Sequence, residues 1–248
     1  MTPRFPDGFL WGTATAAHQV EGGNHMNDWW EWEQVRSRIK DGSSSDPACD
    51  HYSRFRSDFD LLRRLHQNAH RLSVEWSRIE PEAGRFSQEA IEHYREVLEA
   101  LRERGIQPMV TLHHYSNPLW IAREGGWLNP AIVEHFKTYV ARVFSELGEL
   151  ADLWVTINEP TGIAYQGYVL GEWPPGQKDA SLAMRVLVNL LSAHWRAYEV
   201  IKEARPQAQV GLAHHLRIFD PARPLFPTDR LVAYAYDRVF NHRYIPSG

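Results

Sequence analysis

Short apolar runs alternate along the chain with stretches in which apolar residues recur every three to four positions. The short runs, rich in β-branched and aromatic residues, predict five buried strands, at residues 9–17, 69–76, 107–114, 154–160 and 209–214. The periodic stretches predict amphipathic helices, at about residues 51–67, 87–105, 129–148 and 182–202. Because strand and helix alternate about five times, we predict an α/β fold with parallel strands and covering helices.

Several residues mark where these helices begin and end. Ser87 can cap the second helix, and Gly105 can stop it. Asn129 at the cap and Pro130 in the first turn are start signals for the third helix, which Gly148 ends.

Three stretches fit neither pattern. Residues 27–33 hold three tryptophans among acidic side chains and are expected to form a loop. Residues 42–47 are rich in serine and are expected to be exposed. Residues 219–248 are rich in proline and arginine and then in aromatic residues, and the sequence assigns them no role.

Polar and aromatic side chains gather where the predicted strands end. They are Gln19, Glu75, Trp76, His113, His114, Tyr115, Asn158, Glu159, His214 and His215. In a barrel of parallel strands the chemistry sits on the loops at the carboxyl ends, so we expect these side chains to share one rim. We expect no metal at His214 and His215, because no acidic residue or cysteine keeps ligand spacing with them.

Glu159 is the strongest candidate for chemistry. It ends the buried strand 154–160, which stops at Pro160 because proline lacks the N–H that a central strand needs. Burial disfavours the charged form of a carboxylate, which suits a proton donor. The alternative is that Glu159 only pairs with an arginine at a strand end.

Composition narrows the class of protein. The 248 residues are 43% hydrophobic and 23% charged with a net charge of −4, as in one large domain or two small ones, and no basic run indicates a nucleic-acid partner. The single Cys49 excludes an internal disulfide and fits a cytoplasmic protein. No segment predicts a signal peptide or a membrane span. Ten tryptophans suit a large core or stacking on sugars.

Four motifs in order along the chain resemble glycoside hydrolase family 1, the retaining β-glucosidases. The first, residues 9–23, has the Gln-x-Glu-Gly ending of the opening strand. The others are residues 71–79, residues 111–115 with Pro118, and residues 156–160 with Asn-Glu-Pro. The resemblance implies a (β/α)8 TIM barrel, of which this chain holds about five βα units as the N-terminal part of a single domain, residues 1–248.

The resemblance also implies roles for five residues. Glu159 matches the general acid/base, and Asn158 matches the residue that bonds the sugar 2-hydroxyl. Gln19 and His114 match groups that grip the hydroxyls of the non-reducing sugar. Arg71 matches the arginine that keeps the nucleophile ionised, although it could instead be a structural cation inside the barrel. No metal and no other cofactor is implied.

Neighbouring residues are expected to play lesser parts or to depart from the family. We expect His113 to serve in packing or behind the site, and Glu75 to form an ion pair. His18 stands where the family usually has tyrosine, and Tyr115 where tryptophan is common. Both changes could tune the sugar pocket.

The family's nucleophile is a glutamate in a Thr-Glu-Asn-Gly motif on the seventh strand, and this sequence contains no such motif. We therefore expect a β-glucosidase-like hydrolase whose substrate is a β-linked glucoside or related small saccharide, inactive as an isolated chain. We expect completion by self-association or by a complementing C-terminal barrel fragment, because an open piece of barrel leaves bare strand edges. The alternative function is a non-catalytic sugar-binding or regulatory remnant of the same fold.

Overall fold

The computed structural model describes residues 4–242. The chain divides between Ala213 and His214 into two compact units, and each is described by itself. The first unit contains the sheet and the predicted rim residues except His214 and His215, which belong to the second unit. The second contains α10 (Pro227–Asp237) and η4 (Arg238–His242), with an ion pair of 2.9 Å between Arg223 and Asp229. Within residues 4–242, no helix combines the length and the apolar character that a membrane crossing requires.

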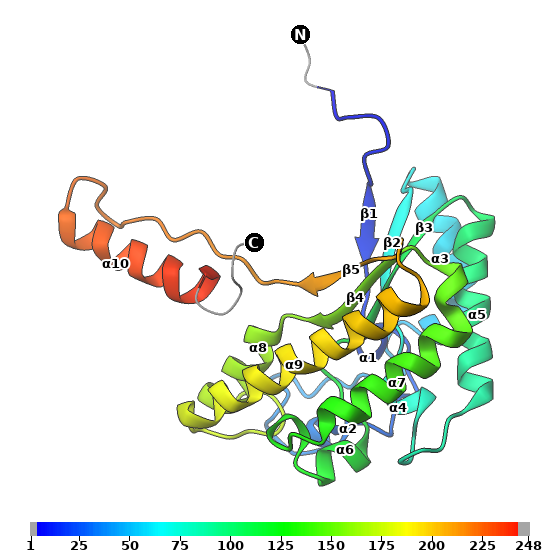
Figure 1. The fold of residues 1–248 in the computed structure, drawn as a ribbon, viewed down its shortest axis with the longest axis horizontal. Helices are drawn as coiled ribbons and strands as arrows, with labels where there is room; N and C mark the ends of the chain where they lie inside the picture. The colour runs from blue at the N-terminus through cyan, green and yellow to red at the C-terminus, as the bar shows by residue number, and fades with distance from the viewer. Residues whose placement is uncertain (1–3, 243–248) are drawn as a thin grey trace. The chain divides into compact units, whose positions relative to one another are not determined.

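The first unit is built on a parallel five-stranded sheet with the strands in chain order (Figure 1). The strands are β1 (Gly12–Ala14), β2 (Ala69–Ser73), β3 (Gln107–His113), β4 (Leu153–Asn158) and β5 (Gln209–Ala213). Every neighbouring pair is parallel. The predicted α/β fold is therefore confirmed, and a strand is found at each of the five predicted places, although β1 is shorter than predicted at both ends.

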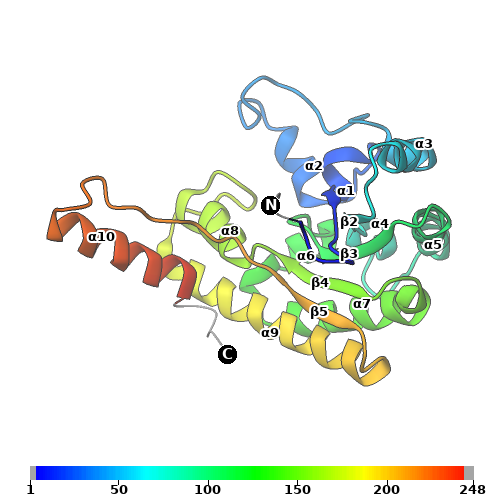
Figure 2. The same ribbon diagram turned by 90° about the horizontal axis from the view of Figure 1, so that it is seen from above.

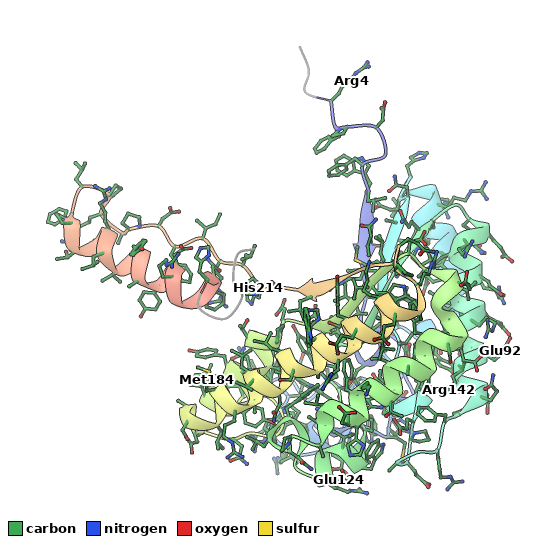
Figure 3. The ribbon with its side chains drawn as sticks, in the orientation of Figure 1. Arg4, Glu92, Glu124, Arg142, Met184 and His214 are labelled. Atoms are coloured by element: carbon green, nitrogen blue, oxygen red, sulfur yellow. The ribbon has the colours of Figure 1, made fainter. Side chains whose placement is uncertain are left out.

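Four long helices cover one side of this sheet, as Figure 2 shows most clearly. They are α3 (His51–Arg64), α5 (Gln88–Glu103), α7 (Ile132–Leu147) and α9 (Ala180–Ala204). Their buried faces repeat at helical spacing, and charged residues such as Glu92 and Arg142 lie on the outer side of α5 and α7 (Figure 3). This arrangement of parallel strands with helices outside is that of a partial barrel.

Short helices follow the carboxyl ends of the strands and lie at that end of the sheet (Figure 1). They are α1 (Ala17–Val20), α2 (Asp28–Glu33), α4 (Trp76–Ile79), α6 (Leu119–Arg123), α8 (Pro160–Ala164), and the single turns η1 (Gly126–Leu128) and η3 (Tyr165–Leu170); η2 (Gly148–Leu150) follows α7. The connections that lead from the strand ends to the next long helices therefore carry the candidate rim residues.

Capping residues account for both the correct and the incorrect helix boundaries. Ser87 Oγ accepts from Ala90 N at 3.2 Å, so the predicted cap of α5 is confirmed. The predicted start at Asn129 is wrong, because α7 begins at Ile132 and Asn129 Oδ1 instead accepts from Ala131 N in the preceding turn. The prediction of a loop for residues 27–33 is also wrong.

The short helix α2 occupies that stretch because Asn27 caps it. Asn27 Oδ1 accepts from Trp30 N at 2.8 Å, and the acidic residues Asp28 and Glu31 lie in the first turn, where they favour a helix. The second predicted strand is likewise too long at its end. It stops at Ser73, and Glu75 caps α4 by accepting from Ser77 N at 3.3 Å.

Aromatic side chains fill the space between the sheet and the helices. Trp76 stacks on Tyr139 with ring centroids 4.9 Å apart, and Trp127 and Trp154 are as fully buried. Burying each of these side chains contributes several kcal/mol, on the order of 25 cal/mol per Å² of apolar area. Part of the tryptophan content therefore belongs to the core.

Candidate active site

Glu159 lies in the turn between β4 and α8, at the carboxyl edge of the sheet. Its φ of +46° is in the left-handed region, and its N–H donates to Ala213 O at 2.8 Å. Pro160 takes the first position of α8, where an N–H is not needed. A non-glycine residue held in this region costs about 1–3 kcal/mol, and such strain gathers at functional sites.

Tyr115 donates a hydrogen bond to Glu159, with 2.8 Å between the phenol oxygen and Oε2. The register pairs His113 with Ile157, so Tyr115 and Glu159 leave adjacent strands at the same level. Burial raises the pKa of Tyr115, and the hydrogen bond and negative charge of Glu159 raise it further. The phenol therefore remains a donor at neutral pH.

His114, Arg71 and Asn158 gather around the same pair. Burial, and then the positive charge of Arg71, lower the pKa of His114 to about 3, so its imidazole is neutral at pH 7. Asn158 is 2% exposed, and its side chain hydrogen-bonds the phenol of Tyr115. Within residues 4–242, Arg71 forms no ion pair and its buried Nε has no hydrogen-bond partner. A neutral imidazole, a cation and an amide thus lie around the phenol that bonds Glu159.

Gln19 is placed differently from the other four predicted residues. It lies on α1, which follows β1, and its side chain is exposed. Since the strand order is β1-β2-β3-β4, it sits three strands from Glu159 along the same carboxyl edge. The compact group therefore contains Glu159, Asn158, His114 and Arg71, with Gln19 farther along the rim.

A cavity of about 470 Å³ adjoins Tyr115. Aromatic rings make up much of its wall, namely Trp29, Trp32, Tyr115, Trp127, Tyr168 and Trp173. Trp173 packs on Tyr115 with ring centroids 4.7 Å apart and on Trp29 at 5.5 Å. Flat apolar walls with a few polar groups are typical of small-molecule sites, and tryptophan faces suit the C–H faces of sugars.

Asp28 is an acidic residue on the wall of this cavity. Burial raises the pKa of Asp28 to about 7. The backbone N–H and the side-chain amide of Asn117 donate to its two oxygens, at 2.8 and 2.7 Å. Asn117 Oδ1 in turn lies 3.1 Å from Nε2 of His113, which is buried against Trp127. The polar groups beneath the cavity therefore form one connected chain.

The raised pKa of Asp28 predicts a pH-dependent stability. A raised folded-state pKa gives stability that is complete below the unfolded value of about 4 and is lost as the pH rises through about 7. We expect the free energy of unfolding to fall by on the order of 4 kcal/mol from this group over that range. Urea titrations at pH 5 and pH 8 measure the free energy of unfolding. In the Asp28→Asn variant, the part of its pH dependence that comes from Asp28 should be absent.

Asp46→Asn provides the matched control for that measurement. The side chain of Asp46 is 35% exposed, and the N–H of Gly23 and the ring of His25 lower its pKa, so it stays ionised from pH 5 to 8. The Asp46 variant should keep the wild-type pH dependence. Equal slopes for wild type and Asp28→Asn would contradict the prediction.

Comparison with known proteins decides the family. The model for glycosyl hydrolase family 1 matches residues 1–245. The chain belongs to this family. Beta-glucosidase A of Thermotoga maritima is 37% identical over 225 residues, which cover 88% of this chain and 50% of that protein. Beta-glucosidase A of Acetivibrio thermocellus is 35% identical, with 88% of this chain and 50% of that protein covered.

Solved structures agree with the family model. The family 1 beta-glucosidase of T. maritima superposes with a TM-score of 0.92 at 34% identity, covering 96% of this chain and 55% of that one. The beta-glycosidase of Pyrococcus horikoshii gives 0.88 at 39% identity, covering 96% and 54%. The fold is thus that of the family 1 TIM barrel, and this chain spans about half the length of the relatives it matches.

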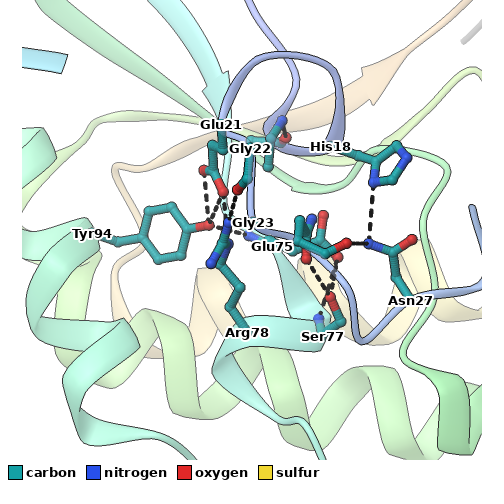
Figure 4. Close-up of polar contacts among 12 residues, drawn as sticks. His18, Glu21, Gly22, Gly23, Asn27, Glu75, Ser77, Arg78 and Tyr94 are labelled. Carbon is teal, nitrogen blue, oxygen red and sulfur yellow. Dashed lines mark hydrogen bonds and ion pairs between the residues drawn. The ribbon is translucent and has the colours of Figure 1, made fainter. Parts of the chain in front are cut away.

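One expectation about a residue near the family motifs has a clear outcome. The ion pair expected for Glu75 is wrong: within residues 4–242 its carboxylate instead accepts from Ser77 Oγ at 2.7 Å and Ser116 Oγ at 2.8 Å. His18, which replaces the usual tyrosine, places Nδ1 3.2 Å from Asn27 Nδ2 (Figure 4). Both residues belong to a buried polar layer behind the rim.

Glu21 and Arg78 form the charged centre of that layer (Figure 4). Arg78 Nε donates to Glu21 Oε2 at 2.8 Å, and the phenol of Tyr94 donates to Oε1 at 2.9 Å. Burial raises the pKa of Glu21 to about 7, although the charge of Arg78 opposes the shift. Glu21 belongs to the Gln-x-Glu-Gly motif, so this part of the motif supports the strand end that carries Gln19.

The sequence did not reveal three features of the site: the contact of Tyr115 with Glu159, the buried Asp28, and the position of Trp173 on the cavity wall. Tyr115 was identified as a departure from the family, but spacing alone does not show which side chain a phenol meets. Asp28 and Trp173 come from connections whose path depends on packing between distant segments.

Proposed function

We propose that this chain supplies the acid/base half of a retaining β-glucosidase site. The observation that carries the proposal is that Asn158, His114 and Arg71 gather around Tyr115, whose phenol donates to Glu159 at the carboxyl edge of the sheet. The two curated relatives named above are beta-glucosidases, and one T. maritima structure is a complex with castanospermine. We infer that residues 1–248 form part of a single barrel domain with a β-linked glucoside as substrate.

Glu159 would protonate the oxygen of the leaving group as the glycosidic bond breaks, and would later take a proton from the water that releases the sugar. Asn158 would bond the sugar 2-hydroxyl, where contacts tighten in the transition state. His114, neutral at pH 7, and Gln19 would each offer a donor and an acceptor to neighbouring hydroxyls. The aromatic cavity beside Tyr115 would take the leaving group.

Arg71 would stand beside the nucleophile. The lack of an ion-pair partner within residues 4–242 favours this role over that of a structural cation, because a cation kept only for the barrel's structure is normally paired. Retaining hydrolysis needs a second carboxyl about 5–5.5 Å from the acid. The family resemblance places that carboxyl on a seventh strand, beyond the five strands found here.

The test is complementation. We expect residues 1–248 alone to give no turnover of an aryl β-glucoside above that of the Glu159→Gln variant. We expect turnover to appear when a second polypeptide supplies strands six to eight of the family barrel with its Thr-Glu-Asn-Gly motif. We call that assembly the completed barrel. Steady turnover by the single chain would contradict the division of roles, and sugar binding without turnover by the completed barrel would favour the non-catalytic alternative.

A further inference from the structure

Tyr115 and Glu159 meet although both backbones are strained. Each is a non-glycine residue in the left-handed region, with φ of +74° for Tyr115 and +46° for Glu159. Each lies two residues after a position where the adjacent strands β3 and β4 are paired. Two strained positions whose side chains bond to one another at 2.8 Å indicate a contact that the fold maintains. Gly162 leaves room for the bonded oxygen, since a Cβ there would lie 3.3 Å from Glu159 Oε2.

We propose that Tyr115 is a positioning residue that fixes which oxygen of Glu159 carries the catalytic proton. The inference rests on the proposed function. The phenol O–H donates to Oε2, so Oε2 acts as the acceptor and the acidic proton of the neutral acid sits on Oε1. When the glycosidic C–O bond breaks, that proton moves from Oε1 to the leaving oxygen, whose electron pair accepts it, and Glu159 is left as a carboxylate.

The hydrogen bond changes strength during this step. Before proton transfer it joins a phenol to a neutral carboxylic acid, and afterwards it joins the phenol to a carboxylate, which makes it charge-assisted and roughly twice as strong. An interaction that strengthens toward the transition state accelerates the chemical step rather than merely binding substrate. The hydroxyl of Tyr115 stays protonated throughout, because burial and the adjacent carboxyl of Glu159 raise its pKa.

Kinetics of the completed barrel test the role. Tyr115→Phe removes only the hydroxyl, and we expect kcat/KM for alkyl β-glucosides to fall on the order of 10- to 100-fold, the value of one charge-assisted hydrogen bond. For 2,4-dinitrophenyl β-glucoside, whose leaving group needs no proton, kcat/KM should stay within about twofold. An equal loss on both substrates would reduce Tyr115 to a structural residue and overturn the proposal.

Tyr139→Phe is the matched control. It also removes a buried phenol hydrogen bond, to Leu112 O at 3.0 Å, but Tyr139 packs in the core on Trp76 and Phe136. It should lower stability and leave the ratio of alkyl to dinitrophenyl reactivity unchanged.

A second measurement does not depend on hydrolysis. In the 248-residue chain labelled with ¹³Cζ-tyrosine, the Tyr115 signal, assigned by its loss in Tyr115→Phe, should change its chemical shift when Glu159→Gln replaces the carboxyl group that accepts from the phenol. The same chemical shift in wild type and Glu159→Gln would refute the contact whatever the function. A clear change of shift in a completed barrel without turnover would instead refute the proposed function.

Discussion

Replacing Glu159 with glutamine in the completed barrel is expected to lower kcat/KM for alkyl β-glucosides by about 10²–10⁴-fold, the usual contribution of a general acid. Glutamine keeps the size of the side chain and can still accept from the Tyr115 phenol, but it has no proton to give to the leaving oxygen. The assay is initial-rate kinetics on a series of glucosides whose leaving groups differ in acidity.

The leaving-group series distinguishes loss of the acid from loss of the fold. With 2,4-dinitrophenyl β-glucoside the first step needs no protonation, so kcat/KM should barely change. The second step still needs a base to activate water, so the covalent intermediate should accumulate and kcat and KM should fall together. Glu172→Gln, an exposed carboxyl farther along the same connection, should behave as wild type. An unchanged rate on alkyl glucosides in Glu159→Gln would exclude the acid role.

The spacing of apolar residues along the sequence predicted the fold correctly, because each strand and each helix buries one continuous apolar surface. The strand at residues 154–160 shows this well: β4 is buried at every position from Leu153 to Asn158, and nothing but a central strand fits such a run next to Pro160. Helix ends were less predictable. Asn129 and Asn27 are both good caps, yet only Asn27 starts a helix of its own, because packing of the following residues decides between the two outcomes.

The sequence predicted which residues of the candidate site lie at strand ends, but it did not predict which of their side chains contact one another. Parallel strands bring Asn158, Glu159 and His114 to one edge whatever the loops do, so position along the strand was sufficient. The hydroxyl of Tyr115 reaches Glu159 only because two turns adopt left-handed conformations, which the sequence does not signal at non-glycine residues. For Glu75 the sequence predicted a contact that does not form. We expected an ion pair with a cation, and the hydroxyls of two serines donate to its carboxylate instead.

The largest stability effect is expected at the buried pair of Glu21 and Arg78. Arg78→Met should lower the free energy of unfolding by about 3–5 kcal/mol at pH 8, because it leaves the carboxylate of Glu21 buried without its charge partner. The two side chains are 5% and 17% exposed, so water cannot replace the lost partner. Urea unfolding of the 248-residue chain, followed by circular dichroism, measures the loss.

Arg56→Met is the matched control for burial. Arg56 lies 2.9 Å from Glu96, almost the same separation as in the buried pair, but both side chains are about half exposed. Removing this surface pair should cost no more than about 1 kcal/mol, because water screens the charges and solvates whichever one remains. Equal losses in the free energy of unfolding of Arg78→Met and Arg56→Met would show that water solvates the pair of Glu21 and Arg78. Such a result would contradict the explanation that burial makes the loss of Arg78 costly.

The pH dependence of the Arg78→Met loss gives a sharper test. Burial raises the pKa of Glu21 to about 7 even with Arg78 present, and removing that positive charge raises it further. A group with a raised folded-state pKa retains its stability at low pH and loses it as the pH rises through that value. At pH 5, Glu21 is neutral in both proteins, so the difference between wild type and Arg78→Met should shrink well below its value at pH 8. A difference that grows as the pH falls would reverse the sign and show that Glu21 remains ionised in the folded chain.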